Sequence, residues 1–281
     1  MVLLKVFLVL CFVAYGRSLN VNSDVDAKSN SKIRIMERRG MYVKSSAYLE
    51  LYFFFSKWHK ERVRTESVYL KEFVKQMNQI FETQKNILHV TFSFLKASVW
   101  NPSKKAYTSQ GFLDAEELKR QLKKQANKVE KHWNKTHPYK PITAFVFLTT
   151  EKIQDKTRNP DIVSGISGRI GGICLLDEKI AAATDNGSFS GVRAAALQLS
   201  ILMGSVYDGQ KPPGKDFVRG SDGAQDCKPE DGYLMGKWNT NGNSFKLSYC
   251  SPHQHIMGLR QRGPTCYGNS EEKKELLKRG K

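Results

Sequence analysis

Few side chains in this chain could carry chemistry, and they are widely spread. Among six histidines only His253 and His255 lie close together, in a stretch flanked by cysteines. In an extended strand such a pair faces one side and could chelate a metal. Because no carboxylate accompanies the pair as a general base, we expect a solvated loop here.

Phosphate-binding and acyl-transfer motifs are missing from the sequence. Gly165, Gly168 and Gly171 are spaced three apart, whereas a dinucleotide site needs G-x-G-x-x-G directly after a strand. The sequence has no G-x-S-x-G nucleophile elbow either.

The chain has 281 residues, of which 40% are hydrophobic, and this composition indicates a folded globular protein rather than a disordered, collagenous or coiled-coil one.

The pattern of residues 1–16 indicates whether the protein is secreted. Lys5 precedes the apolar run 6–13, and the small-residue ending Ala14-Tyr15-Gly16 follows. This arrangement is typical of a signal peptide and is too short to span a bilayer. A buried N-terminal strand is the alternative. We expect a secreted, extracellular protein without a membrane span, and a monomer.

Removal of residues 1–16 also removes Cys11, and four cysteines remain. An even number in an oxidising compartment predicts two disulfides, with three possible pairings. A zinc ribbon is the alternative, but the sequence lacks a C-x-x-C pair. All four lie in the C-terminal part, which we expect to be a disulfide-bonded, loop-rich subdomain. They are Cys174, Cys227, Cys250 and Cys266.

The hydrophobic pattern predicts strands and helices in alternation. Period-two or continuous apolar runs indicate strands, and apolar residues three and four apart indicate amphipathic helices. This order is typical of an α/β domain with a mixed twisted sheet and long helices. We expect strands at 48–55, 88–94, 142–149 and 180–183, a basic turn at 57–64, and helices at 66–83, 115–133, 190–203 and 271–279.

The domain division follows from the same patterns. Residues 17–45 are polar and basic and form an N-terminal lead. Residues 46–270 read as one domain, followed by a charged C-terminal tail at 271–281. Beyond Gly204 we expect mostly loop until the last helix.

The segment 190–209 resembles a known family. Its helix is followed by Gly204 and then by Asp208-Gly209. The metzincin metalloproteases, in particular the reprolysin-like group of tick saliva and arthropod venoms, carry a zinc helix with the pattern H-E-x-x-H-x-x-G-x-x-H-D-G. The resemblance implies a zincin domain in which Gly204 and Asp208 are structural. The alternative is an accidental match to a buried Ala-rich helix.

Two further landmarks extend the resemblance, and one of them carries a cysteine. Residues 172–174 resemble the strand of the family that ends in Gly-Cys, and residues 231–235 resemble its Met-turn, with Met235 as the methionine. Residues 247–251 resemble the segment with the partner cysteine. The resemblance therefore implies the disulfides Cys174–Cys250 and Cys227–Cys266.

The catalytic residues of that family are replaced in this chain. Leu197, Ile201 and Tyr207 stand at its three histidine positions, and Gln198 stands at the position of its catalytic glutamate. Leucine and isoleucine offer no lone pair to a metal, and glutamine cannot act as a base near neutral pH. We therefore expect no zinc, no cofactor and no proteolysis.

The chain is strongly basic, with a formal net charge of +18. Excess positive charge suits polyanions such as heparin-like polysaccharides, although a single basic cluster is more often a solvated face. Basic residues cluster at 119–131 and in a shorter stretch that supplies our candidate polyanion-binding residues. These candidates are Lys57, Lys60, Arg62 and Arg64.

Two sequons, at Asn134 and Asn186, add a prediction of exposed N-glycosylation sites.

The combined interpretation is a secreted, inactive metalloprotease homologue that holds an extracellular protein or peptide of a host or prey in its former substrate cleft, acting on haemostasis or defence. Polyanion binding is one alternative. An active zinc endopeptidase with unconventional ligands around the histidine pair is the other.

Overall fold

A five-stranded mixed sheet forms the centre of the computed structural model, which describes residues 46–279. The strand order is β2-β1-β4-β8-β7. The first four strands run parallel and β7 runs antiparallel to β8, which confirms the expected α/β class. The strands are β1 (Ser46–Phe55), β2 (His89–Val99), β4 (Ala144–Thr149), β7 (Gly165–Ser167) and β8 (Ile180–Thr184).

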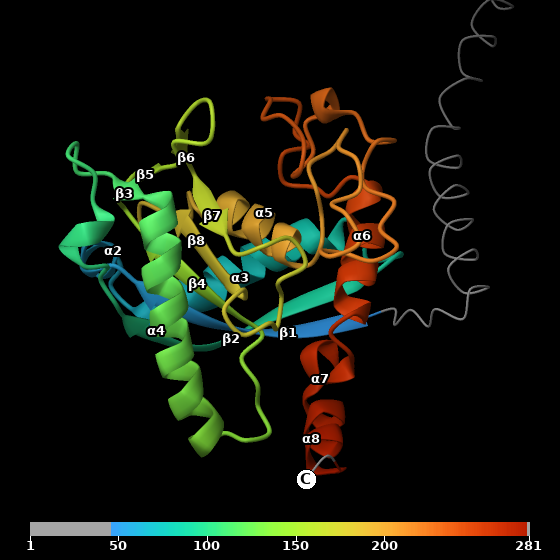
Figure 1. Ribbon diagram of the computed structural model, residues 1–281, viewed down its shortest axis with the longest axis horizontal. Helices are drawn as coiled ribbons and strands as arrows, with labels where there is room; N and C mark the ends of the chain where they lie inside the picture. The colour runs from blue at the N-terminus through green and yellow to red at the C-terminus, as the bar shows by residue number, and fades with distance from the viewer. Residues whose placement is uncertain (1–45, 280–281) are drawn as a thin grey trace, which may run out of the picture. The chain divides into compact units, whose positions relative to one another are not determined.

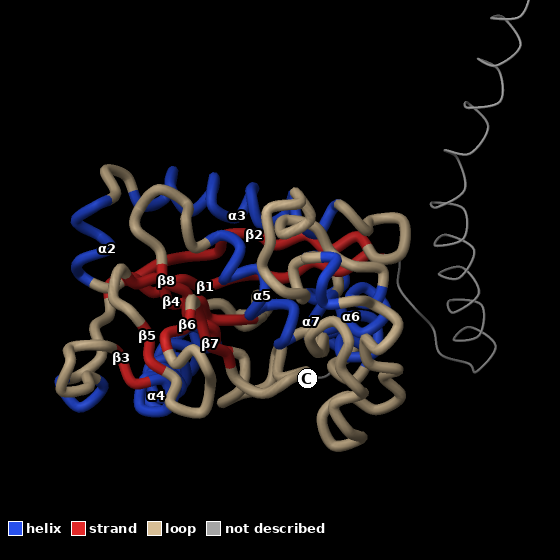
Figure 2. The backbone as a smooth tube through the Cα atoms, turned by 90° about the horizontal axis from the view of Figure 1, so that it is seen from above, coloured by secondary structure: helices blue, strands red, loops and turns tan. Residues whose placement is uncertain are grey.

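Helices cover both faces of this sheet (Figures 1 and 2). Helix α3 (Glu66–Glu82) lies on one face, with α5 (Val192–Leu202) beside it, and α4 (Ala115–Thr136) lies on the other. Because side chains alternate along a strand, β1 supplies both cores. Phe53 packs toward α3, 6.2 Å from Phe73 between ring centroids, and Tyr52 packs toward α4, 6.2 Å from Trp133.

Shorter elements complete the described chain. A second sheet has the order β3-β5-β6 and lies next to the N-terminal end of α4. Its strands are β3 (Leu113–Asp114), β5 (Ile153–Gln154) and β6 (Ile162–Val163). The remaining helices are α2 (Lys57–Arg62), η1 (Lys104–Ala106), η2 (Pro229–Asp231), α6 (Cys250–Arg260), α7 (Pro264–Tyr267) and α8 (Ser270–Arg279).

The predicted strands and long helices are all present, but two segments differ. The expected basic turn after β1 begins with helix α2, which Ser56 caps by accepting a hydrogen bond from the His59 N–H at 3.2 Å. The expected loop around the histidine pair is helix α6, buried from Cys250 to Leu259. A helix buried on every side lacks the 3.6-residue polar–apolar period that reveals an amphipathic one.

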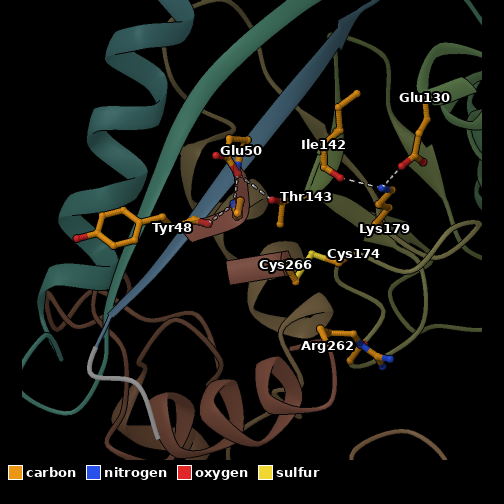
Figure 3. Close-up of a disulfide and its surroundings, with 11 residues drawn as sticks. Tyr48, Glu50, Glu130, Ile142, Thr143, Cys174, Lys179, Arg262 and Cys266 are labelled. Atoms are coloured by element: carbon orange, nitrogen blue, oxygen red, sulfur yellow. Dashed lines mark hydrogen bonds and ion pairs between the residues drawn. A yellow bond between two sulfur atoms is a disulfide. The ribbon is translucent and has the colours of Figure 1, made fainter. Parts of the chain in front are cut away.

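The C-terminal residues belong to the domain instead of forming a separate tail. Lys273 of α8 is 1% exposed, pairs with Glu50 of β1 and donates to the Tyr48 carbonyl oxygen at 2.9 Å. Glu50 also accepts from the Thr143 hydroxyl at 3.3 Å, as Figure 3 shows. Burial lowers the pKa of Lys273, and Glu50 opposes that shift. The ion pair attaches α8 to the sheet.

All four cysteines are paired, but our pairing was wrong. The disulfides are Cys174–Cys266 (Figure 3) and Cys227–Cys250. Cys250 begins α6, whereas Cys266 lies in α7 beyond its other end. An eleven-residue helix is about 16 Å long, so α6 separates the two cysteines. Its C-terminal side, with α7, brings Cys266 to Cys174, and its first residue, Cys250, pairs with Cys227.

Several sequence predictions concern other parts of the chain. The signal peptide 1–16 and the basic lead 17–45 lie outside the described residues. Within 46–279, no helix combines the length and the apolar character needed to cross a membrane. Both sequon asparagines, Asn134 and Asn186, are exposed; whether they carry glycans stays a prediction.

Candidate functional site

The start of α5 is fixed by a buried carboxylate. Asp185, which follows β8, accepts hydrogen bonds from the Gly191 N–H at 2.8 Å and the Tyr69 hydroxyl at 2.5 Å. The His59 ring lies 2.6 Å from the same carboxylate, with both side chains fully buried. Burial raises the pKa of Asp185, but the bonds from His59, Tyr69 and Gly191 lower it more. This network positions α5 against α2 and α3.

The exit from α5 depends on a glycine. Gly204 has φ +114°, and a Cβ there would lie 3.0 Å from the Gln254 carbonyl oxygen and 3.2 Å from Gly258 Cα. Positive φ and this close approach to α6 both favour glycine. The chain then turns toward Tyr207 and Asp208.

The chain after α5 contacts the segment that we compared with a Met-turn. The Asp208 N–H donates to the Met235 carbonyl oxygen at 3.0 Å. The Ser248 hydroxyl donates to the Asp208 carboxylate at 2.8 Å. Burial raises the pKa of Asp208 to about 6. The structure thus brings together Asp208 and Met235, which are distant in sequence.

A pocket of about 490 Å³ opens beside α5. Gln198, Ile201 and Tyr207, at three of the four family positions, line it, and strand β7 contributes Ile166 and Ser167. Leu197 is 8% exposed and does not line this pocket. The other lining residues are Lys119, Asp155, Arg158, Gly168, Arg169, Ile170, Ser205, Val206, Gln210 and Phe217.

Arg158 reaches into this pocket from the turn between β5 and β6. Its Nη1 donates to the Tyr207 hydroxyl at 3.1 Å, and its Nε lies 3.2 Å from Asp155 Oδ2. Its guanidinium lies 6.0 Å from the Tyr207 ring centroid. Sequence reasoning missed Arg158 because no motif surrounds it.

Two buried polar side chains point to the same pocket. Ser205 is fully buried, and its hydroxyl has no hydrogen-bond partner among residues 46–279. Gln198 is 3% exposed, and its side-chain amide makes no hydrogen bond within the same range. Both residues line the pocket.

The residues that we compared with the family's zinc ligands do not have side chains that suit zinc. Leu197 and Ile201 present hydrocarbon only, and the Tyr207 hydroxyl already accepts from Arg158. Across the described part of the chain, no three His, Cys, Asp or Glu side chains are grouped as a metal would require. A zinc site in proteins takes three or four nitrogen, sulfur or carboxylate ligands.

The histidine pair lies on α6, away from any solvated loop. Residues two apart in a helix point about 200° apart, so His253 and His255 cannot hold one metal from the same face. The His253 Nδ1 lies 2.8 Å from the Tyr249 carbonyl oxygen. His255 is fully buried, 5.8 Å from Phe81 between ring centroids, and burial lowers its pKa to about 3.

Comparison with known proteins gives two sequence relatives. One is "A disintegrin and metalloproteinase with thrombospondin motifs like" of Bombyx mori, 32% identical over 116 residues, which are 39% of this chain and 16% of the relative. The other is "Venom metalloproteinase antarease-like TtrivMP_A" of Tityus trivittatus, 32% identical over 114 residues, 39% of this chain and 28% of the relative.

This chain is distantly homologous to metalloproteinases. It spans less than a third of the length of either relative, and no family profile matches it. Similar solved structures include metalloproteinase-II from Bacteroides fragilis, with a TM-score of 0.44, 12% identity and coverage of 78% of this chain and 57% of that one. Archaemetzincin from Methanopyrus kandleri has a TM-score of 0.39 and 13% identity, and the match covers 76% of this chain and 94% of that one.

Proposed function

We propose that this chain is a secreted, catalytically inactive metalloprotease homologue of the reprolysin-like metzincin type. It binds an extracellular protein or peptide of a host or prey in the pocket beside α5. The single observation that carries the proposal is the composition of that pocket, where Gln198, Ile201 and Tyr207 line a cavity of about 490 Å³. The pocket is large enough for a ligand, and its residues are unsuited to the family's chemistry.

Hydrolysis needs groups that these positions do not supply. A zinc peptidase polarises the peptide carbonyl with its metal and takes a proton from metal-bound water with a carboxylate. Gln198 cannot take that proton, and a leucine and an isoleucine replace the first two imidazoles. Binding requires none of these groups.

Strand β7 supports the binding proposal. It is the last strand of the five-stranded sheet, and its Ile166 and Ser167 line the pocket. An edge strand offers main-chain donors and acceptors that an extended peptide can pair with. Main-chain pairing would give affinity, and the adjoining pocket would select the side chain.

Site-specific cross-linking tests the proposal. A photoreactive amino acid at Phe217, an exposed pocket residue, should capture a protein from the extracellular fluid in which this chain occurs. The control is the same amino acid at Val68, which is 65% exposed on α3. Equal capture at both positions would contradict pocket binding, and chelator-sensitive peptide cleavage by the purified chain would contradict inactivity.

For polyanion binding, the alternative function, helix α4 supports a second candidate surface. On α2, the Lys60 ammonium lies 3.1 Å from the Glu66 carboxylate, so one of the four candidate cations is already paired. Four exposed lysines on α4 have no ion-pair partner within residues 46–279 and lie three or four residues apart, on one side of the helix. They are Lys124, Lys128, Lys131 and Lys135.

A further inference from the structure

We propose that the pocket beside α5 binds a carboxylate group of its peptide ligand. The inference rests on the proposed function, because it names the chemical group that the pocket selects. It follows from three features of the described residues: an arginine at the pocket, the side-chain amide of Gln198 in the pocket wall, and an excess of positive charge.

Arg158 has unused donors. A guanidinium carries five N–H groups in a fixed fork, and in this structure one bonds to the Tyr207 hydroxyl and another faces Asp155. Its side chain is 43% exposed, so it is accessible to a ligand. Arginine and carboxylate form paired, parallel hydrogen bonds of high strength. Arg158 is held over Tyr207 and is ready to form them.

Gln198 provides a neutral donor in the pocket. Gln198 lines the pocket, and its side-chain amide makes no hydrogen bond to a described residue. The Ser205 hydroxyl is buried behind the pocket wall, without a hydrogen-bond partner among residues 46–279. A carboxylate accepts several hydrogen bonds at once, so it can bond to Arg158 and to the Gln198 amide together.

The charges around the pocket favour an anion. Lys119, Arg158 and Arg169 line it against one carboxylate, Asp155, although Lys119 is already paired with Glu116 at 2.7 Å. Asp155 is already engaged, because it faces Arg158 and accepts from the Thr157 hydroxyl at 2.6 Å. Arg169 has no ion-pair partner within residues 46–279. A cleft lined by one sign of charge concentrates ligands of the opposite sign.

The remaining walls suit a peptide rather than an inorganic anion. Ile166, Ile170 and Val206 line the pocket together with the polar groups. They can pack against the methylene groups that carry a carboxylate, while the edge strand pairs with the main chain. The carboxylate can belong to a glutamate or aspartate side chain or to the end of a peptide chain.

Three five-residue probes separate these sources and test the proposal. Ac-Ala-Ala-Glu-Ala-Ala-NH2 offers a side-chain carboxylate, its glutamine counterpart offers none, and Ac-Ala-Ala-Ala-Ala-Ala-OH offers a terminal one. Binding to the secreted chain is measured by NMR titration, following the side-chain amide signal of Gln198. We expect one of the two carboxylate peptides to bind at least ten-fold more tightly than the glutamine peptide and to shift that signal.

Variants assign the effect to Arg158. Arg158→Gln should reduce the affinity of the preferred peptide to that of the glutamine peptide, and Arg158→Lys should restore part of it. Lys71→Gln, which removes an exposed charge on α3, is the matched control and should change nothing. Unchanged amide spectra away from the pocket verify that each variant is folded.

The outcomes distinguish this inference from the proposed function. Equal affinity for the glutamate, glutamine and C-terminal peptides, with the Gln198 signal shifted, would overturn the carboxylate inference and leave peptide binding standing. The absence of any binding by all three probes would overturn the inference, and cross-linking at Phe217 would then decide the proposed function separately.

Discussion

The main-chain N–H of Asp208 donates to the carbonyl oxygen of Met235 at 3.0 Å. This bond joins the turn after α5 to a distant loop. A second bond, from the Ser248 hydroxyl to the Asp208 carboxylate, fixes the same turn. The two bonds position the segment that carries Tyr207.

If the segment has the family's geometry, as we propose, four substitutions should create a zinc site. The unmodified protein should contain no stoichiometric zinc, and its unfolding temperature should be unaffected by chelators, since no metal binding is linked to its folding. The variant that combines Leu197→His, Gln198→Glu, Ile201→His and Tyr207→His should gain close to one equivalent of zinc, measured by elemental analysis.

Single changes serve as the controls for that experiment. Leu197→His alone should bind almost no zinc, because one imidazole is far short of a three-ligand site. One equivalent of zinc in the unmodified protein would contradict the inactive-homologue proposal. Failure of the fourfold variant to bind zinc would show that the ligand geometry itself differs from that of the family.

The two disulfides should contribute unequally to stability. They close segments of 92 and 23 residues, and each doubling of loop length adds about 0.6 kcal/mol to the entropy lost by the unfolded chain. Replacing Cys174 and Cys266 by alanine should therefore lower the unfolding free energy by about 1 kcal/mol more than replacing Cys227 and Cys250. Urea titration measures the difference. A non-reduced peptide map that joins Cys174 to Cys250 would refute this connectivity.

Acid should destabilise the protein through His255. Its folded-state pKa of about 3 lies below the ordinary value near 6.5, because burial disfavours the charged ring. The neutral His255 ring therefore adds its full contribution to the free energy of unfolding above pH 6.5. As the pH falls from 6.5 toward 3, the unfolded chain binds a proton that the folded protein does not, and this contribution is lost. We expect the free energy of unfolding to fall by about 1 kcal/mol per pH unit between pH 6 and pH 4.

The variant His255→Leu should remove that part of the pH dependence. Unfolding free energies of the variant and the parent, measured at several pH values, give the contribution of His255 as a difference, which cancels the other titrating groups. His89→Leu, at an exposed histidine of β2, is the control. Identical pH slopes for the parent and His255→Leu would show that the buried ring does not govern acid stability.

Binding to heparin should depend on α4 more than on α2. Replacing the four unpaired lysines of α4 by glutamine should weaken binding and reduce its salt dependence, because fewer counterions are released. The matched variant replaces Lys57, Lys60, Arg62 and Arg64 by glutamine and removes the same number of charges. Elution of the parent below about 0.15 M salt, or a larger effect of the α2 variant, would contradict this assignment.

The sequence by itself determined the elements whose burial leaves a local pattern, either a helical repeat or a continuous apolar run. Helices α3 and α4 were predicted because their apolar residues repeat with the helical period, and the central strands because both faces are covered. It also determined that Leu197, Gln198, Ile201 and Tyr207 offer neither an imidazole nor a carboxylate, since residue types decide this chemistry wherever the residues lie.

Only the tertiary structure decided features that depend on distant segments meeting. Helix α6 is buried on all sides and shows no period, so its presence, and with it the pairing of Cys174 with Cys266, could not be derived from local pattern. The contact of Arg158 with Tyr207 likewise joins two loops that no motif connects. Short-range patterns record the burial of one face, whereas these contacts follow from how the whole chain packs.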